Sequence, residues 1–402
     1  MTMQGSSEAI PSGAGAAAPK QAALRLRMAP KLAYRNLFHD RLSLVVTLIG
    51  IVFAVVLLSF QSGIYLGIER TIAAVIDETK GELWVAPIGT KSIDLPSLLP
   101  GRERYSVLSV PGVESVETLS MGFARWRKRN GGATTVLLVG SDWNTGGLRP
   151  WNVVDGSVEE LAAPKAVAID RTYYGDLDVE GLGDSAEING MTVNVGAVTH
   201  GIRSFTTLPY VFTTLGRAQT MLGAKKWQGS YALISLKPGA DEEKVQKEIQ
   251  ARLPDAEVLK RETFRSRSIN YWLFNTAAGS GLIAGTALAL IVGIVIVAQT
   301  LYASTKDHLN EFATLRALGA SSGYIIQVIL LQALFSAVVG YALGMALTLG
   351  IFKLAEDTTL NVVMTPGLAL LLFVVTIGMC MLAAISAIFK VIRIDPAGVF
   401  SR

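Results

Sequence analysis

The chain is 402 residues long, half of its residues are apolar, and its formal net charge at pH 7 is +4. Only 17% of the residues are charged and the mean hydropathy is +0.42, which excludes an ordinary soluble domain, where about a quarter of the residues are charged. The basic excess lies in the tails: the chain through Arg41 has six basic and two acidic residues, and the chain from Lys390 has three and one. Cytoplasmic tails of membrane proteins require this distribution, so the charge does not imply nucleic-acid binding.

The first 41 residues are predicted to lie outside the bilayer. Residues 1–23 are rich in Ala, Gly, Ser and Pro, which predicts a disordered cytoplasmic tail, and they lack the apolar core of a signal peptide. Residues 24–41 mix Arg and Lys with Leu, Met, Tyr and Phe. This mixture predicts an amphipathic helix along the cytoplasmic lipid headgroups.

The first membrane span is predicted from an uncharged run over residues 42–68. Apolar residues such as Ile72 and Ile76 continue at helical spacing beyond it, with charged residues between them. The span and a stalk are therefore expected to form one helix over residues 42–80, ended by Gly81.

Residues 81–264 predict an α+β domain that is large enough to bury its own core. Asn-Gly steps at Asn130 and Asn189 predict hairpin turns. An amphipathic helix with an Asp cap is expected over 241–253. Short runs of β-branched and alternating residues predict strands at 82–87, 113–119, 134–140, 166–170, 192–198 and 231–236.

A second stalk and span are predicted over residues 265–301. Arg261, Arg265 and Arg267 precede the span on its outer side, against the positive-inside rule, and are compatible with a solvated stalk that matches the first. The remaining segments are a polar loop at 302–323, the third span at 324–352, a short external loop at 353–366, the fourth span at 367–390 and a cytoplasmic tail at 391–402.

The expected fold class is a membrane protein of four transmembrane α-helices with a large α+β extracytoplasmic domain inserted between spans 1 and 2. An even number of spans and two basic tails place both termini in the cytoplasm. The spans carry no Asp, Glu, Lys or Arg at their centres, whereas ion-driven carriers usually place ionisable residues there.

The polar loop between the second and third spans predicts a short amphipathic helix. Such a helix could rest on lipid headgroups as a connector or dock onto a soluble partner, and its amphipathicity alone favours neither. It is expected to end at Gly319 and to carry on one side His308, Glu311, Phe312, Leu315 and Leu318.

The residues of this loop resemble a known family. The run Glu311-Phe312-Ala313-Thr314-Leu315-Arg316-Ala317-Leu318-Gly319 resembles the coupling helix of DevC-type permeases, within the MacB, LolC and FtsX superfamily of ABC-transporter membrane subunits. Residues 32–37 resemble the family's elbow helix, and Asp395-Pro396-Ala397-Gly398-Val399-Phe400 its C-terminal ending. The resemblance implies that ATPase contacts come from Lys306, His308, Glu311, Phe312, Leu315, Arg316, Leu318 and Gly319.

The resemblance also implies partners and a mechanism. Two copies of the chain would convert the closure of two cytoplasmic ATPases, which bind ATP and Mg, into movement of the external domains. Export or efflux would then use a periplasmic membrane-fusion adaptor and an outer-membrane channel, and the chain would reside in the bacterial inner membrane among its lipids. Alternatives are an FtsX-like signalling subunit that regulates a cell-wall enzyme, and a lipoprotein-release permease.

No catalytic motif is found, so the chain is expected to be neither an enzyme nor a cofactor-binding protein. The three histidines are far apart, and Gly89-Thr90-Lys91-Ser92 lacks the spacing of a phosphate loop. Two glycine pairs at a spacing of four allow close helix approach, either within one chain or at a homodimer seam. These pairs are Gly281 with Gly285 and Gly340 with Gly344.

Overall fold

The computed structural model describes residues 41–101, 103–307, 314, 321–355, 358 and 361–392. The predictions for residues 1–40 and 393–402, and for most of the 302–323 loop, lie outside the described residues. The chain divides into two compact units. The membrane unit comprises the chain through Gln61, Thr286–Gly350 and the chain from Met364, and the stalk unit comprises Ser62–Gly285 and Ile351–Val363.

Four helices among the described residues are long and apolar enough to cross a membrane, which confirms the four predicted spans. Helix α2 has 37 residues, or about 55 Å at 1.5 Å per residue, against about 30 Å for the hydrocarbon core of a bilayer. It ends at Asp77, four residues before Gly81. Just after this end, the Thr79 hydroxyl donates a hydrogen bond to the Ile76 carbonyl at 2.7 Å. The four helices are α2 (Arg41–Asp77), α8 (Ala277–Asp307), α10 (Ser322–Ala355) and α11 (Pro366–Ile392).

Small residues bring the helices of the membrane unit together. A Cβ atom added to Gly50 of α2 would lie 3.0 Å from Thr300 of α8, and one added to Gly293 of α8 would lie 3.3 Å from Ala54 of α2. The hydroxyl of Tyr341 on α10 donates to the carbonyl of Ala369 on α11 at 2.7 Å. Backbone approach at glycine is the usual way for membrane helices to gain packing contacts.

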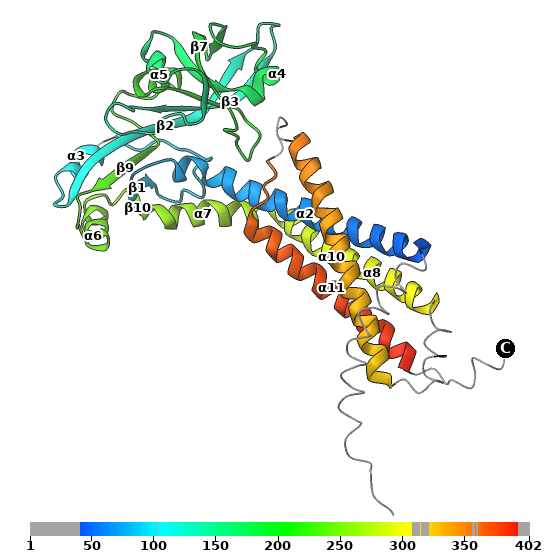
Figure 1. Cartoon of the computed structure of the whole chain (residues 1–402). Helices are drawn as coiled ribbons and strands as arrows, with labels where there is room; N and C mark the ends of the chain where they lie inside the picture. The colour runs from blue at the N-terminus through cyan, green and yellow to red at the C-terminus, as the bar shows by residue number, and fades with distance from the viewer. Residues whose placement is uncertain are drawn as a thin grey trace, which may run out of the picture. The chain divides into compact units, whose positions relative to one another are not determined.

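The inserted domain is built on a ten-stranded sheet, all of it within the stalk unit (Figure 1). The strand order is β10-β1-β9-β2-β3-β8-β5-β7-β4, and β6 pairs with β2 and β7. The strands are β1 (Leu83–Pro87), β2 (Val113–Arg127), β3 (Ala133–Ser141), β4 (Val153–Gly156), β5 (Ala166–Asp170), β6 (Ser185–Ile188), β7 (Met191–Thr199), β8 (Tyr210–Thr214), β9 (Tyr231–Leu236) and β10 (Ala256–Lys260).

The long strand β2 joins two parts of this sheet. Its first half pairs with β9 and its second half with β3. One core cluster contains residues of α3 and α6, and another contains residues of α4 and α5, so each part of the sheet has its own helical cover. The shorter helices are α3 (Glu103–Leu108), α4 (Tyr174–Leu177), α5 (Leu215–Met221), α6 (Glu242–Arg252), α7 (Arg261–Phe274) and the 3-10 helices η1 (Glu159–Ala162) and η2 (Arg171–Tyr173).

Local signals in the sequence predicted much of this domain. All six predicted strands are present, and the fold class is confirmed as four candidate spans with an α/β domain between the first and second. Asn189 and Gly190 both have positive φ in the β6–β7 turn, as their residue types predict. Asp241 caps α6 by accepting hydrogen bonds from the backbone N–H groups of Glu243 and Lys244.

Candidate functional site

Two stalk helices lie side by side in the stalk unit. They are the second part of α2 and the helix α7 (Figure 1), and a cluster of apolar side chains joins them. Ile72 and Ala73 of α2 are buried against Ile269 and Leu273 of α7. The spacing of four between Ile269 and Leu273 places both on one face of α7.

Two of the three arginines that break the positive-inside rule join the second stalk to the first and to the residues just after it. Arg265 Nε lies 3.0 Å from Asp77 Oδ1, and Arg265 Nη1 lies 3.6 Å from Glu69 Oε1, both on α2. Arg261 donates to the carbonyl of Thr79 at 3.2 Å. These cations therefore have partners in the stalk itself, which explains their presence beside a span.

Arg267 connects α7 to the sheet rather than to α2. Its two terminal nitrogens each lie 2.7 Å from a carboxylate oxygen of Glu257, which belongs to β10. These hydrogen bonds raise the pKa of the Arg267 guanidinium. A bidentate pair of this kind fixes orientation as well as distance.

A short segment at Ser92–Asp94 is bound by both α7 and the sheet. From α7, the Ser268 hydroxyl accepts from the Ile93 N–H at 3.2 Å, and the Trp272 indole donates to the Ser92 hydroxyl at 3.1 Å. From the sheet, the Tyr231 hydroxyl of β9 donates to the Ile93 carbonyl at 3.0 Å. The segment is thus the point at which the second stalk is hydrogen-bonded into the core of the domain.

Asp94 is the most unusual group in this segment. It is 1% exposed, and its Oδ1 accepts a hydrogen bond from the Tyr210 hydroxyl of β8 at 2.7 Å, while Oδ2 has no hydrogen-bond partner among the residues that the structure describes. Burial raises the pKa of Asp94 to about 6, although the side chains of Tyr210 and Trp272 oppose the shift. A carboxylate with one unpaired buried oxygen weakens the junction at neutral pH.

The second stalk is not continuous with the second span. Helix α7 ends at Phe274 and α8 begins at Ala277. The Thr276 hydroxyl donates to the Trp272 carbonyl at 2.6 Å, and a Cβ atom added to Gly279 would lie 2.1 Å from that same oxygen. The chain turns so tightly here that only glycine fits, and the two stalks therefore differ: the first is one helix with its span, and the second is broken from it.

Most of the predicted ATPase-coupling residues lie outside the described residues. Lys306 is exposed in the last turn of α8. The assignment of all eight residues to ATPase coupling stays a prediction. The seven outside the described residues are His308, Glu311, Phe312, Leu315, Arg316, Leu318 and Gly319.

The two glycine pairs have different surroundings. Cβ atoms added to Gly340 and Gly344 of α10 would lie 2.5 Å and 2.8 Å from Ile51 and Val55 of α2, so these glycines allow close packing within one chain. A Cβ atom added to Gly281 would meet nothing within 4 Å, and Gly285 is half-buried in α8.

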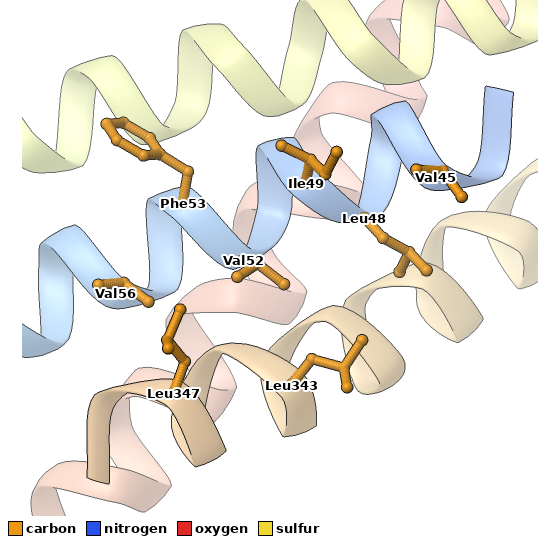
Figure 2. Close-up of a pocket in the computed structure, with 8 residues that line it drawn as sticks. All are labelled: Val45, Leu48, Ile49, Val52, Phe53, Val56, Leu343 and Leu347. Atoms are coloured by element: carbon orange, nitrogen blue, oxygen red, sulfur yellow. The ribbon is translucent and has the colours of Figure 1, made fainter. Parts of the chain in front are cut away.

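The membrane unit has an open groove of about 440 Å³ between α2 and α10 (Figure 2). The residues that line it offer no side chain that could hold a polar or charged solute. Among the described residues there is also no cluster of His, Cys, Asp or Glu suited to a metal ion. The groove is lined by Val45, Leu48, Ile49, Val52, Phe53, Val56, Leu343 and Leu347.

Comparisons with known proteins match both parts of the chain. Residues 44–252 match the family model of the MacB-like periplasmic core domain, and residues 283–396 match that of the FtsX-like permease C-terminal region. No curated protein matches the chain.

Three solved structures are similar to part of this chain. The periplasmic region of MacB from Actinobacillus actinomycetemcomitans is 10% identical, with 49% of this chain and 96% of that chain covered and a TM-score of 0.36. The extracellular domain of the noncanonic ABC-type transporter YknZ from Gram-positive bacteria is 16% identical, with 45% and 99% covered and a TM-score of 0.34. A domain of a putative permease protein from Porphyromonas gingivalis is 12% identical, with 44% and 86% covered and a TM-score of 0.30.

Proposed function

The chain belongs to the MacB- and FtsX-like superfamily of ABC-transporter permeases, and from this premise we propose that it couples ATP hydrolysis by a separate cytoplasmic ATPase to motion of its inserted domain. The chain is then a membrane subunit and the ATPase partner binds ATP and Mg. In this proposal the inserted domain is extracytoplasmic, both termini are cytoplasmic, and the motion drives export or efflux across the bacterial envelope.

The junction at Ser92–Asp94 is the observation that supports this function most directly. Both α7 and two strands of the sheet are hydrogen-bonded to these three residues, and Arg267 ties α7 to β10 at 2.7 Å. Buried hydrogen-bonded networks rigidify the elements that they join. Displacement of α7 would therefore move the sheet with it, which is what a subunit that transmits mechanical work requires.

The chemistry of the spans favours work on a substrate outside the membrane. The groove in the membrane unit is lined only by apolar side chains, and the centres of the spans carry no Asp, Glu, Lys or Arg. Carriers that move polar solutes or ions through the bilayer place such groups along the path. We therefore infer that substrate is handled by the inserted domain and its partners.

The likeness of residues 311–319 to the coupling helix of DevC-type permeases supports the choice of partners. We propose two copies of the chain, two ATPases that bind Lys306 and the loop after it, a membrane-fusion adaptor and an outer-membrane channel. Cross-linking in cells separates this proposal from its alternative: an adaptor bound to the inserted domain supports export, whereas a cell-wall hydrolase bound there supports signalling.

The coupling loop provides the decisive test. We expect a nucleotide-hydrolysing subunit to co-purify with the native chain, and Phe312→Asp or Leu315→Asp to lower its recovery at least about tenfold, since a charge on an apolar anchor removes a hot spot. Thr314→Asp, on the opposite side of the predicted helix, is the matched control and should retain the ATPase. Unchanged recovery with both apolar substitutions, or no ATPase with the native chain, contradicts the proposal.

A further inference from the structure

The connector between α10 and α11 packs as part of the stalk unit. Residues Ile351–Val363, which are the end of α10 and the start of the connector after it, group with the inserted domain and stalks. The Val363 N–H donates to the Gly63 carbonyl of α2 at 3.1 Å. The Asn361 amide nitrogen donates to the Thr71 hydroxyl at 2.7 Å and lies 3.4 Å from the Gly67 carbonyl.

Two glycines of α2 create the room for this contact. A Cβ atom added to Gly67 would lie 1.7 Å from the Asn361 carbonyl oxygen, and one added to Gly63 would lie 2.6 Å from the Phe352 ring. Glycine inside a helix costs about 1 kcal/mol relative to alanine. Two glycines one turn apart on the same face are therefore explained by the approach of the connector.

We propose that Asn361 is a positioning residue that fixes the connector to the Gly63–Gly67 face of α2 and gives the stalk a second attachment through α10. This inference rests on the proposed function. Helix α10 is unbroken over 34 residues, from just after the predicted ATPase-binding loop to the connector. The route through α8 instead passes the break before Ala277. Displacement of α10 can thus act on α2 within the stalk unit, where Phe352 of α10 lies against Gly63 and Asn361 is hydrogen-bonded to Thr71.

Loss of the Asn361 side chain should change the position of the connector on α2 more than it lowers the stability of the folded chain. The Thr71 hydroxyl also donates to the Gly67 carbonyl at 2.7 Å, so it keeps a hydrogen bond when Asn361 is removed. Asn361→Ala therefore leaves no newly unpaired buried donor on α2. Gly67→Ala acts from the other side, because its methyl group would push the Asn361 backbone away.

The test measures deuterium exchange in the chain purified with its native ATPase, with and without ATP and vanadate. In the native chain we expect nucleotide to change exchange in the peptides of the stalks and inserted domain. Asn361→Ala and Gly67→Ala should reduce this nucleotide-dependent difference about fivefold, the factor that matches one net hydrogen bond. Outside the peptides that contain residues 63–71 and 361–363, exchange without nucleotide should stay as in the native complex, and so should basal ATP hydrolysis. A general loss of stability would not allow either.

Gly350→Ala on α10 is the matched control, since a Cβ atom there meets nothing within 4 Å. It should keep the full nucleotide response. If nucleotide changes nothing in the native complex, the proposed function fails. If the native response is present and both Asn361→Ala and Gly67→Ala retain it, the positioning role of Asn361 is refuted while the proposed function stands.

Discussion

Replacing Asp94 by Asn should stabilise the stalk unit at neutral pH. The carboxyl has a pKa of about 6 in the folded domain against 3.8 for an unperturbed group. The folded state therefore binds more protons than the unfolded state between these values, and stability falls as the pH rises through that window. Each unit of difference between the folded and unfolded pKa is worth about 1.4 kcal/mol. The unfolding free energy that the native chain has lost by neutral pH is therefore about 3 kcal/mol.

The size of the effect can be followed over an accessible pH range. From pH 7.5 to pH 5 the native carboxyl should regain about 1.4 kcal/mol of unfolding free energy. The Asn side chain of Asp94→Asn does not titrate. The unfolding free energy of this variant should therefore exceed that of the native chain most at pH 7.5, and the difference should be about 1.4 kcal/mol smaller at pH 5. Tyr210→Phe should act in the opposite direction, costing about 1–3 kcal/mol at pH 7.5 and less at pH 5, because it removes the hydrogen bond to Asp94 Oδ1.

Tryptophan fluorescence during urea unfolding in mild detergent measures these changes selectively. All six tryptophans of the chain lie between Trp84 and Trp272, within the stalk unit. Asp255→Asn, at an exposed carboxyl of the same domain, is the control and should leave the pH dependence of the native chain intact. If the unfolding free energies of the native chain and Asp94→Asn change equally with pH, the Asp94 carboxyl does not have a raised pKa in the folded domain.

Two further substitutions test packing and charge. Gly344→Ala should lower the thermal stability of the chain in detergent, because its Cβ atom would lie 2.8 Å from Val55. Gly378→Ala, whose Cβ atom meets nothing within 4 Å, should raise the stability through a gain in helix propensity of about 1 kcal/mol. A change of the same sign in both variants would contradict the packing of α10 on α2. Arg267→Met and Glu257→Gln should each destabilise the stalk unit. A double-mutant cycle measured by urea unfolding should give a coupling energy of about 1 kcal/mol, which falls with added salt. Strictly additive effects of the two substitutions would show that this ion pair does not hold α7 to β10.

The sequence predicted the spans and most strands because their signals are local. Uncharged runs longer than a bilayer mark the spans, and Asn-Gly steps mark the turns. Strand β8 was not predicted, because four of its five residues are buried and it shows no alternation of apolar and polar positions. The break between α7 and α8 was also not predicted, since no proline marks it.

The residues of the candidate site were harder to find because their environment comes from distant parts of the chain. Asp94 and its partner Tyr210 are 116 residues apart, and nothing beside Asp94 in the sequence indicates that it is buried. Gly63 and Gly67 lie in an apolar run, where a glycine pair has no obvious partner until residue 361 is placed beside it. The arginines of the second stalk were noticed as an exception to a topology rule, but only the structure gives their partners Glu69, Asp77 and Glu257.

The pairing of the two stalks has a consequence for biosynthesis. Arg265 follows its partner Asp77 by 188 residues. At bacterial and eukaryotic elongation rates of about 5–20 residues per second, the ribosome needs about 10–40 s to supply the second stalk after the first. During that interval the apolar face of α2 at Ile72 and Ala73 has no α7 to cover it, so a nascent chain halted within the inserted domain should present this face to chaperones.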